Sequence, residues 1–180
     1  GHYMGTGSIP LVYLQNSGLG NIVNPILSLA SPEVYGIPIV LMLGWRGEPG
    51  VNDEPQHVHQ GRVMFAMLES MNIPTVVLSD DNLKADIQTK SAIKQARETK
   101  GPVAIVVRKN TFSKFEGSQF GTDHSMSREE AIIAAAESLE DNAAVICTTG
   151  MPSRELFEFR ARNNAGHYRD FLTVGGMGHA

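Results

Sequence analysis

The sequence predicts an α/β protein in which parallel sheets are flanked by helices. Two observations support this fold class. Short apolar runs rich in valine and isoleucine recur along the 180 residues, and longer segments with helical signals lie between them. Such runs are typical of strands buried on both faces, and strand–helix alternation indicates a parallel sheet. A hydrophobic content of 42% is sufficient for a real core.

The first part of the chain is expected to hold four strands and three helices. The strands are Pro10–Gln15, Ile37–Gly44, Pro74–Ser79 and Pro102–Arg108. The helices between them are Asn21–Ala30, Gln56–Met71 and Asn82–Lys100. The opening residues, GHYMGTGSIP, have the pattern of a helix end followed by its exit turn.

Local signals set the ends of these helices. Pro25 is expected in the first turn of its helix, where proline is tolerated. Asp53 and Glu54, followed by Pro55, suit the start of the second helix. The third helix has acids at its front and lysines at its back, as the helix dipole favours, and Gly101 is its stop signal.

The pattern changes after residue 108. Residues 109–126 show no steady period and are predicted to be a linker. A second α/β unit is expected to start at Ser127, which forms a capping box with Glu130. Its further elements are the strand AAVICTTG, the helix MPSRELFEFRARNN and the strand FLTVGG. Because so few elements cannot close a core, the chain is expected to be part of a longer protein.

Composition argues against several classes of protein. The net charge is −4 and no basic block is present, which argues against nucleic-acid binding. No apolar run reaches the length of a membrane span. The one cysteine, Cys147, rules out an intrachain disulfide and favours a reducing, cytoplasmic location.

The stretch YLQNSGLGN is the first candidate ligand site. It joins a strand end to a helix start through Gly18 and Gly20, at the end of the strand where ligands bind in open α/β sheets. A dinucleotide-binding G-x-G-x-x-G pattern fails, because Val23 takes the third glycine's place. A phosphate-binding Walker loop fails as well, since no Gly-Lys-Ser/Thr follows. The alternative is a tight turn without a ligand.

The polar segment Gly44–Gly61 is the second candidate, because a long loop after a strand is more often functional than idle. Arg46 could bind a carboxylate, phosphonate or sulfonate with two parallel hydrogen bonds. The alternative for Arg46 is an ion pair with Glu48 or Asp53. His57 could transfer protons near neutral pH, whereas no metal site is expected in this chain.

The stretch CTTGMPSREL is the third candidate. It places a glycine, Gly150, between a strand end and a helix start, and main-chain N–H groups at such a start suit a phosphate. The alternative is an ordinary capped helix.

Four stretches taken together resemble one family. They are VYLQNSGLGN, GWRGEPGVNDEPQHVHQGR, TTGxxSRELFE and DFLTVGGMGHA, and they are similar to phosphonopyruvate decarboxylase, a thiamine-diphosphate-dependent enzyme family. The resemblance covers nearly the whole chain in the same order, and the second and fourth stretches are its specific motifs. Sulfopyruvate decarboxylase is a close relative with similar motifs.

The resemblance implies a thiamine-diphosphate-binding fold with two domains. Residues 1–108 would be the pyrimidine-binding domain, lacking its N-terminal part. Residues 109–126 would be the linker, and residues 127–180 would begin the diphosphate-binding domain. In this family the active site forms between the pyrimidine domain of one subunit and the diphosphate domain of another, so a homo-oligomer is implied.

The resemblance also implies which residues bind the cofactor. Gly175 is similar to the glycine whose carbonyl meets the cofactor's amino group, and Met177 to the bulky residue that bends the cofactor. The remaining implied cofactor-binding residues are Gly18, Gly20, Asn21 and Gly150. The family's glutamate would lie before Gly1 and its magnesium motif after Ala180, so this chain alone is not expected to catalyse.

The implied activity of the full-length parent is removal of CO₂ from 3-phosphonopyruvate, giving phosphonoacetaldehyde, with thiamine diphosphate and Mg²⁺. Arg46 is expected to bind the anionic tail of the substrate. Gln56 and His57 are expected to be pocket groups that act on the reaction intermediate or transfer a proton.

Two alternatives remain open at this point. The substrate could be sulfopyruvate or another 2-keto acid, because phosphonate and sulfonate are both tetrahedral anions. The chain could instead be a non-catalytic or split subunit that binds a partner half.

Overall fold

The computed structural model of the chain describes residues 1–115, 117, 125–140, 142–148 and 150–174. The chain divides into two compact units, Gly1–Glu116 and Gly117–Ala180. The division falls within the segment 109–126, which the sequence predicts to be a linker. The assignment of the units to pyrimidine and diphosphate domains stays a prediction.

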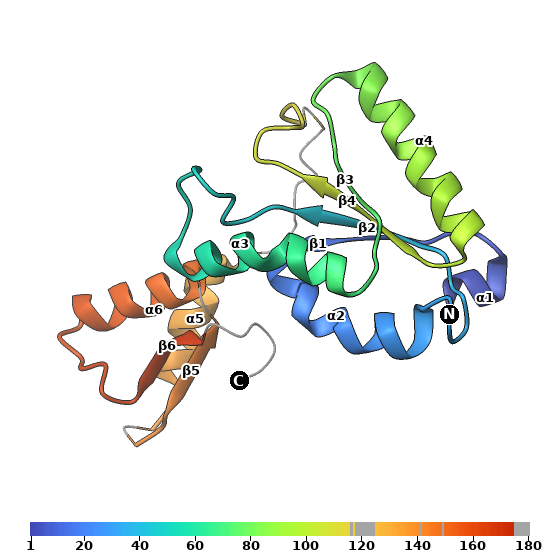
Figure 1. Cartoon of the computed structure of the whole chain (residues 1–180). Coiled ribbons are helices and arrows are strands. Elements are labelled where there is room, and N and C mark those ends of the chain that lie inside the picture. Colours follow the sequence, from blue (N-terminus) through green and yellow to red (C-terminus); the bar gives the residue numbers. More distant parts are fainter. Residues whose placement is uncertain (116, 118–124, 141, 149, 175–180) are drawn as a thin grey trace. The chain divides into compact units, whose positions relative to one another are not determined.

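The first unit is built on a sheet of four parallel strands in the order β1-β2-β4-β3 (Figure 1). The strands are β1 (Leu11–Gln15), β2 (Ile39–Gly44), β3 (Thr75–Val77) and β4 (Pro102–Val107). In the pairing register Gln15 lies opposite Gly44, and Gly44 lies opposite Val107. The carboxyl ends of β1, β2 and β4 therefore stand at one level along the same edge.

The helical segments of this unit are α1 (His2–Thr6), η1 (Asn16–Gly18), α2 (Leu19–Pro25), η2 (Ile26–Ala30), α3 (Pro55–Ser70) and α4 (Asn82–Thr99). The N-cap of α4 is Asp81, whose carboxylate accepts a 2.9 Å hydrogen bond from Lys84 N–H. Helix α1 ends on Gly7 in the left-handed conformation, as its sequence predicts.

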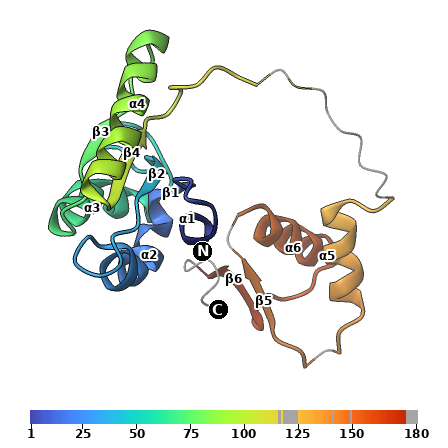
Figure 2. The same cartoon turned by 90° about the vertical axis from the view of Figure 1, so that its right-hand side faces the viewer.

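Both faces of the sheet are covered by helices, as Figures 1 and 2 show. Leu41, Leu43, Ala104 and Val106 point to one face and form a core with buried residues of α2, η2 and α3. The residues between them in β2 and β4, such as Val103 and Ile105, point to the other face and pack against α4. This two-residue alternation fixes which side of each strand meets which helix.

The prediction that all four strands are buried on both faces is wrong for β1 and β3. Leu11, Val12 and Tyr13 of β1 are 56%, 39% and 82% exposed, and Val77 of β3 is 36% exposed. The strand order explains the difference, because β1 and β3 are the two outer strands of the sheet. At an outer strand, apolar composition alone does not predict burial of both faces, although Leu14 and Val76 still pack against the two cores.

The helix expected at Asn21–Ala30 starts two residues earlier and is not uniform. Helix α2 begins at Leu19, and Pro25 is its last residue rather than a member of its first turn. Proline has no N–H and its ring crowds the preceding turn, so the helical pattern changes after it. The following segment, η2, is a π-helix, and Ser31 N–H donates to the Ile26 carbonyl at 2.8 Å.

The second unit contains α5 (Arg128–Glu137), β5 (Val145–Thr148), α6 (Met151–Arg162) and β6 (Asp170–Val174). Strands β5 and β6 pair in parallel. The predicted capping box is confirmed: Ser127 Oγ accepts from Glu130 N–H, and the Glu130 carboxylate accepts from Ser127 N–H at 2.6 Å. Helices α5 and α6 lie side by side (Figure 2), joined by the Arg128–Glu155 ion pair at 2.6 Å.

Candidate functional site

The carboxyl edge of the four-stranded sheet brings together the candidate residues of the first unit. Gly18, Gly20 and Asn21 follow β1, and Arg46 follows β2. The loop after β2 then leads into the first turn of α3. In a parallel sheet the segments after each strand emerge at one edge, which is where ligands bind in open α/β folds. Two of the three stretches chosen from sequence, YLQNSGLGN and Gly44–Gly61, therefore share one place in the fold.

The glycine turn after β1 consists of η1 and the start of α2. A side-chain carbon at Gly20 would meet no atom within 4 Å, so the main chain there is open to a ligand. At Gly18 the same carbon would lie 3.0 Å from the end of the Leu14 side chain. Packing against Leu14 is thus a sufficient reason for a glycine at position 18, and its cofactor contact stays a prediction.

Asn16 joins this turn to the loop after β2. Its side-chain Nδ2 donates to the Arg46 carbonyl at 2.8 Å, and its Oδ1 accepts from Arg46 N–H at 2.9 Å. Only 5% of Asn16 is exposed. One side chain thus satisfies both main-chain groups of Arg46, as a paired strand would.

The Arg46 side chain forms an ion pair with Asp53. The guanidinium donates through Nε to Oδ2 at 2.9 Å and through Nη2 to Oδ1 at 2.5 Å. The Asp53 side chain is 14% exposed and that of Arg46 is 38% exposed. The ion-pair alternative raised for Arg46 is confirmed with Asp53 as partner. Since this geometry is bidentate, the guanidinium plane is held in a fixed direction while one side remains exposed.

Asp53 also organises the main chain of the loop. Its carboxylate accepts from Gly47 N–H at 2.7 Å and from Glu54 N–H at 2.8 Å. The hydrogen bonds from Arg46 hold the pKa of Asp53 well below its ordinary value of 3.8; burial opposes this shift, and the two main-chain bonds add to it. The same pair raises the pKa of Arg46. Both groups are therefore charged at any physiological pH.

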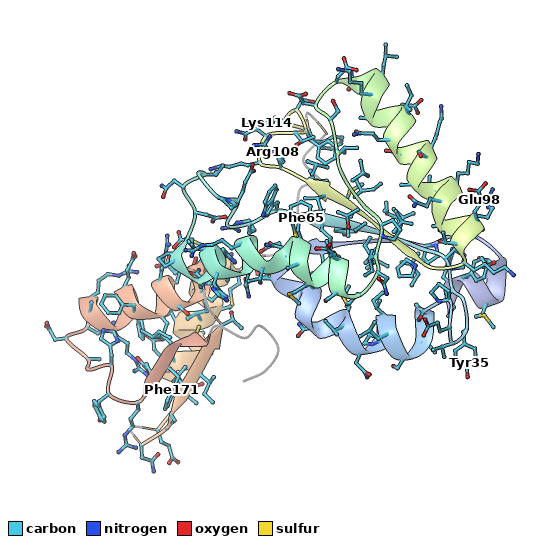
Figure 3. The ribbon with its side chains drawn as sticks, in the orientation of Figure 1. Tyr35, Phe65, Glu98, Arg108, Lys114 and Phe171 are labelled. Carbon is cyan, nitrogen blue, oxygen red and sulfur yellow. The ribbon has the colours of Figure 1, made fainter. Side chains whose placement is uncertain are left out.

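The loop lies directly against α3. Trp45 Nε1 donates to the Gly61 carbonyl at 3.0 Å, and the Trp45 ring meets Phe65 edge-on with centroids 5.0 Å apart. Phe65 projects from α3 (Figure 3). Gly47 has a φ of +69°, and an added side-chain carbon there would overlap the His57 carbonyl. An added carbon at Gly61 would overlap the Gly47 carbonyl. Glycines at positions 47 and 61 permit this close approach.

Gln56 and His57 occupy the first turn of α3. Gln56 is exposed, whereas His57 is half-buried with Nδ1 3.5 Å from Gln60 Oε1. His57 N–H donates to the Glu54 carbonyl at 2.9 Å. The backbone contact between Gly47 and His57 places the histidine beside the Arg46 segment. The structure therefore brings the two ends of the loop together, with Arg46 near one end and His57 just past the other, and their roles stay predictions.

A second ion pair ties the loop to β4. Glu48, which is 7% exposed, forms an ion pair with Arg108. Arg108 stands where the chain leaves β4 (Figure 3). The hydrogen bond to Glu48 raises the pKa of Arg108. A cavity of about 350 Å³ opens beside this pair, between the residues that follow β3 and those that follow β4. The loop after β2 is thus fixed to both neighbouring strands.

In the second unit, Gly150 is the N-cap of α6. Its φ of 106° and ψ of −144° suit only glycine, and an added side-chain carbon would meet no atom within 4 Å. The buried Ser153 hydroxyl lies within hydrogen-bonding reach of the carbonyls of Thr148 and Leu172, which links α6 to both strands. The predicted cofactor-binding residues Gly175 and Met177 lie outside the described residues.

Two site residues were missed by the sequence analysis as functional groups: Asn16 and Asp53. Asn16 stands in a cluster of polar residues at a strand end, which is the one signal that could have identified it. Asp53 was taken as a helix-start residue and as one possible partner of Arg46. The bonds of Asn16 to Arg46 have no sequence signature, because they join residues 30 positions apart. Asp53 is only seven positions from Arg46, and the sequence offered it as one of two possible ion-pair partners.

None of the helices in the described part of the chain combines the length and apolar character of a membrane span. Within the same residues, no group of three or more His, Cys, Asp and Glu side chains could hold a metal ion.

The fold and the site define an α/β protein with a candidate ligand site at the carboxyl edge of a parallel sheet. No family model matches the sequence. The chain is 31% identical over 196 residues to a phosphonopyruvate decarboxylase of Streptomyces hygroscopicus, covering 100% of this chain and 47% of that protein. It is 33% identical over 190 residues to a phosphonopyruvate decarboxylase of Streptomyces viridochromogenes, covering 97% of this chain and 46% of that protein.

A shorter similarity involves the sulfopyruvate decarboxylase subunit alpha of Methanothermobacter thermautotrophicus, 41% identical over 68 residues, or 38% of this chain and 39% of that protein. The chain spans about half the length of the curated relatives that it matches over its whole length. The comparisons confirm that this chain resembles the phosphonopyruvate decarboxylase family from end to end.

Proposed function

We propose that the whole protein removes CO₂ from 3-phosphonopyruvate in a thiamine-diphosphate- and Mg²⁺-dependent reaction that gives phosphonoacetaldehyde. One observation carries this proposal. A chain similar throughout to named phosphonopyruvate decarboxylases gathers its glycine turn, Arg46 and the first turn of α3 at one sheet edge. The reaction class is that of a carboxy-lyase acting on a 2-keto acid. The composition favours a cytoplasmic location.

The described residues fit the cofactor at two places. Gly20 and Gly150 leave the main chain open, since a side-chain carbon at either would meet nothing within 4 Å. At the start of α6, the N–H groups of Met151 and Ser153 precede the first intrahelical donors, and this terminus suits a diphosphate oxygen. Pro152 between them has no N–H to contribute. When bound, thiamine diphosphate supplies the electron sink that 2-keto acid decarboxylation needs.

The chain's own residues would bind and orient the substrate. Arg46, held by Asp53 through Nε and Nη2, offers its exposed side to the tetrahedral anion of the substrate tail. We further propose that His57 and Gln56, which lie in the first turn of α3, hold or move a proton at the reacting end of the substrate. Ordering the loop before substrate arrives removes part of the entropic cost of binding.

We propose that the active protein is a homo-oligomer whose sites lie between subunits. Support comes from the family resemblance, and the word "subunit" in the names of two sulfopyruvate decarboxylase relatives, from Methanothermobacter thermautotrophicus and Methanococcus maripaludis, points to multi-subunit proteins there.

The test is an assay of the natural-length protein with thiamine diphosphate and Mg²⁺. CO₂ release is measured from phosphonopyruvate, sulfopyruvate and pyruvate side by side. A strong preference for phosphonopyruvate is expected. No release from any of the three would reject the decarboxylase proposal and favour a subunit that only binds a partner half.

Sulfopyruvate is the second candidate substrate. The similarity to two sulfopyruvate decarboxylase alpha subunits, 41% and 38% identical over 68 and 74 residues, favours it. In the same assay this candidate predicts faster turnover of sulfopyruvate than of phosphonopyruvate.

A further inference from the structure

We propose that Asn16 is a positioning residue that couples the glycine turn after β1 to the substrate-binding loop after β2. Its buried amide holds the main chain of Arg46, and through it the direction in which Arg46 meets the anionic tail of a 2-keto acid. This inference rests on the proposed function and adds a residue to it.

The geometry of the pair leaves little freedom. The main chain of Arg46 has one donor, its N–H, and one acceptor, its carbonyl. The N–H donates to Asn16 Oδ1 at 2.9 Å, and the carbonyl accepts from Asn16 Nδ2 at 2.8 Å. Arg46 N–H also reaches the Gly44 carbonyl at 3.1 Å, so two acceptors share this donor, and Asn16 Oδ1 is the nearer of the two. Because its side chain is 95% buried, an unmet amide there would be costly.

The other contacts of the loop cannot replace this bond. Asp53 belongs to the same loop, so its ion pair with Arg46 shapes the loop without attaching it to the sheet. Glu48 attaches the loop to β4, and Trp45 attaches it to α3. Among the described hydrogen bonds of the loop after β2, those of Asn16 are the ones that reach the segment following β1.

Asn16 is itself attached to the core of the first unit through the segment that follows it. It is the first residue of η1, and Leu19, which starts α2, is 1% exposed and packs in the core. Gly18 and Gly20, two predicted cofactor-binding residues, follow within four positions. A shift of Arg46 and a shift of this turn are thus mechanically linked through one side chain.

The experiment compares Asn16→Ala, Asn16→Asp and Asn82→Ala in the natural-length enzyme. Asn82 is an exposed asparagine at the start of α4 and serves as the matched control. The first readout separates KM from kcat for phosphonopyruvate. The second is hydrogen exchange of the Arg46 amide, measured by mass spectrometry with fragmentation that resolves single amides.

For Asn16→Ala, KM is expected to rise about tenfold with kcat within about twofold, because binding of the tail is weakened rather than the chemistry. The Arg46 amide is expected to exchange at least about tenfold faster. Asn16→Asp keeps an acceptor for Arg46 N–H but loses the donor to the carbonyl. Its Arg46 main-chain amide should therefore stay protected, whereas KM should rise at least as much as in Asn16→Ala, because a carboxylate oxygen would face the Arg46 carbonyl at a buried site.

A merely structural role gives a different pattern. It would lower kcat through loss of active enzyme and leave KM unchanged, and that result overturns the inference. Unchanged exchange of the Arg46 amide in Asn16→Ala overturns it as well. If Asn16→Ala does not fold, the KM and exchange of Asn16→Asp decide in its place.

Failure of the proposed function is distinguishable from failure of this inference. A wild-type enzyme that releases no CO₂ from any keto acid rejects the function. In that case the exchange measurement alone decides whether Asn16 holds Arg46, since it requires no substrate.

Discussion

At the scale of single residues, Asp53 carries the most contacts in the site. Its carboxylate accepts hydrogen bonds from the Arg46 side chain and from two main-chain N–H groups, those of Gly47 and Glu54. Four donors around one half-buried carboxylate explain why its pKa is lowered. The loop conformation therefore depends on Asp53 being ionised.

We predict that Asp53→Asn lowers the free energy of unfolding at pH 7 by about 1.5–3 kcal/mol, the usual value of hydrogen bonds to a charged group. The wild-type contribution is present above the ordinary pKa of 3.8 and is lost as the pH falls below it, toward the lowered pKa of the folded state. The variant should lack that acid-dependent loss. Urea unfolding between pH 7 and pH 3 measures both effects.

Asp86→Asn is the matched control for this experiment. Asp86 forms a surface ion pair with Lys90, and its side chain is 56% exposed compared with 14% for Asp53. For this control, the free energy of unfolding is expected to change by less than about 0.5 kcal/mol. Equal effects of the two variants would contradict the central place given to Asp53.

Two glycines at the same edge should respond oppositely to alanine. Gly61→Ala places a carbon against the Gly47 carbonyl and should cost about 1–3 kcal/mol of stability. Gly20→Ala adds a carbon in open space within α2 and should stabilise by about 0.5–1 kcal/mol. The same Gly20→Ala change should weaken thiamine diphosphate binding by the natural-length protein. Thermal unfolding measures the stability of both variants, and a cofactor titration measures thiamine diphosphate binding by Gly20→Ala. A Gly61→Ala variant as stable as the wild type would refute the close packing of Gly61 against Gly47.

At the scale of elements, helix α5 begins with a complete capping box. Ser127 and Glu130 each satisfy a main-chain N–H of the other, and these hydrogen bonds lower the pKa of Glu130. A helix of 10 residues is marginal by itself, so its ends matter for its stability.

We predict that Ser127→Ala destabilises the second unit by about 1 kcal/mol. Ser91→Ala, an exposed position within α4, should be neutral or slightly stabilising, because alanine is the better helix former there. Circular dichroism melts of the three proteins measure the difference. A neutral Ser127→Ala would mean that packing against α6 alone holds α5 in place.

At the scale of the whole molecule, the described core is divided unequally. The first unit has two clusters of buried apolar side chains, one on each face of its sheet. In the second unit the buried apolar residues among those described are Ala136 and Leu156. The exposed side chains of the outer strand β1 add apolar surface to the first unit.

We predict that the isolated 180-residue chain is marginally stable, with the second unit unfolding first. Leu156→Ala should lower the midpoint temperature of that early transition, because replacing a buried leucine with alanine lowers the free energy of unfolding by about 2–5 kcal/mol. Leu43 in β2 is 0% exposed, and Leu43→Ala should lower the midpoint temperature of the later transition, that of the first unit. Differential scanning calorimetry separates the two, whereas one cooperative transition at high temperature would contradict the prediction.

The sequence by itself determined the fold class, the approximate positions of the elements and the segments that hold the candidate site. These follow from local properties: apolar periodicity, capping signals and glycine turns. Arg46, His57 and the glycine turn were selected in this way, and the capping box of α5 was predicted to the residue.

Only the tertiary structure decided which strands lie at the edges, where the π-helix replaces the α-helix, and which side chains fix the loop after β2. The exposure of β1 follows from strand order, and strand order is a property of pairing between distant segments. The bonds of Asn16 to Arg46 and of Glu48 to Arg108 join residues 30 and 60 positions apart. No local pattern encodes such partners, because their energy arises only when the sheet has brought the strand ends together.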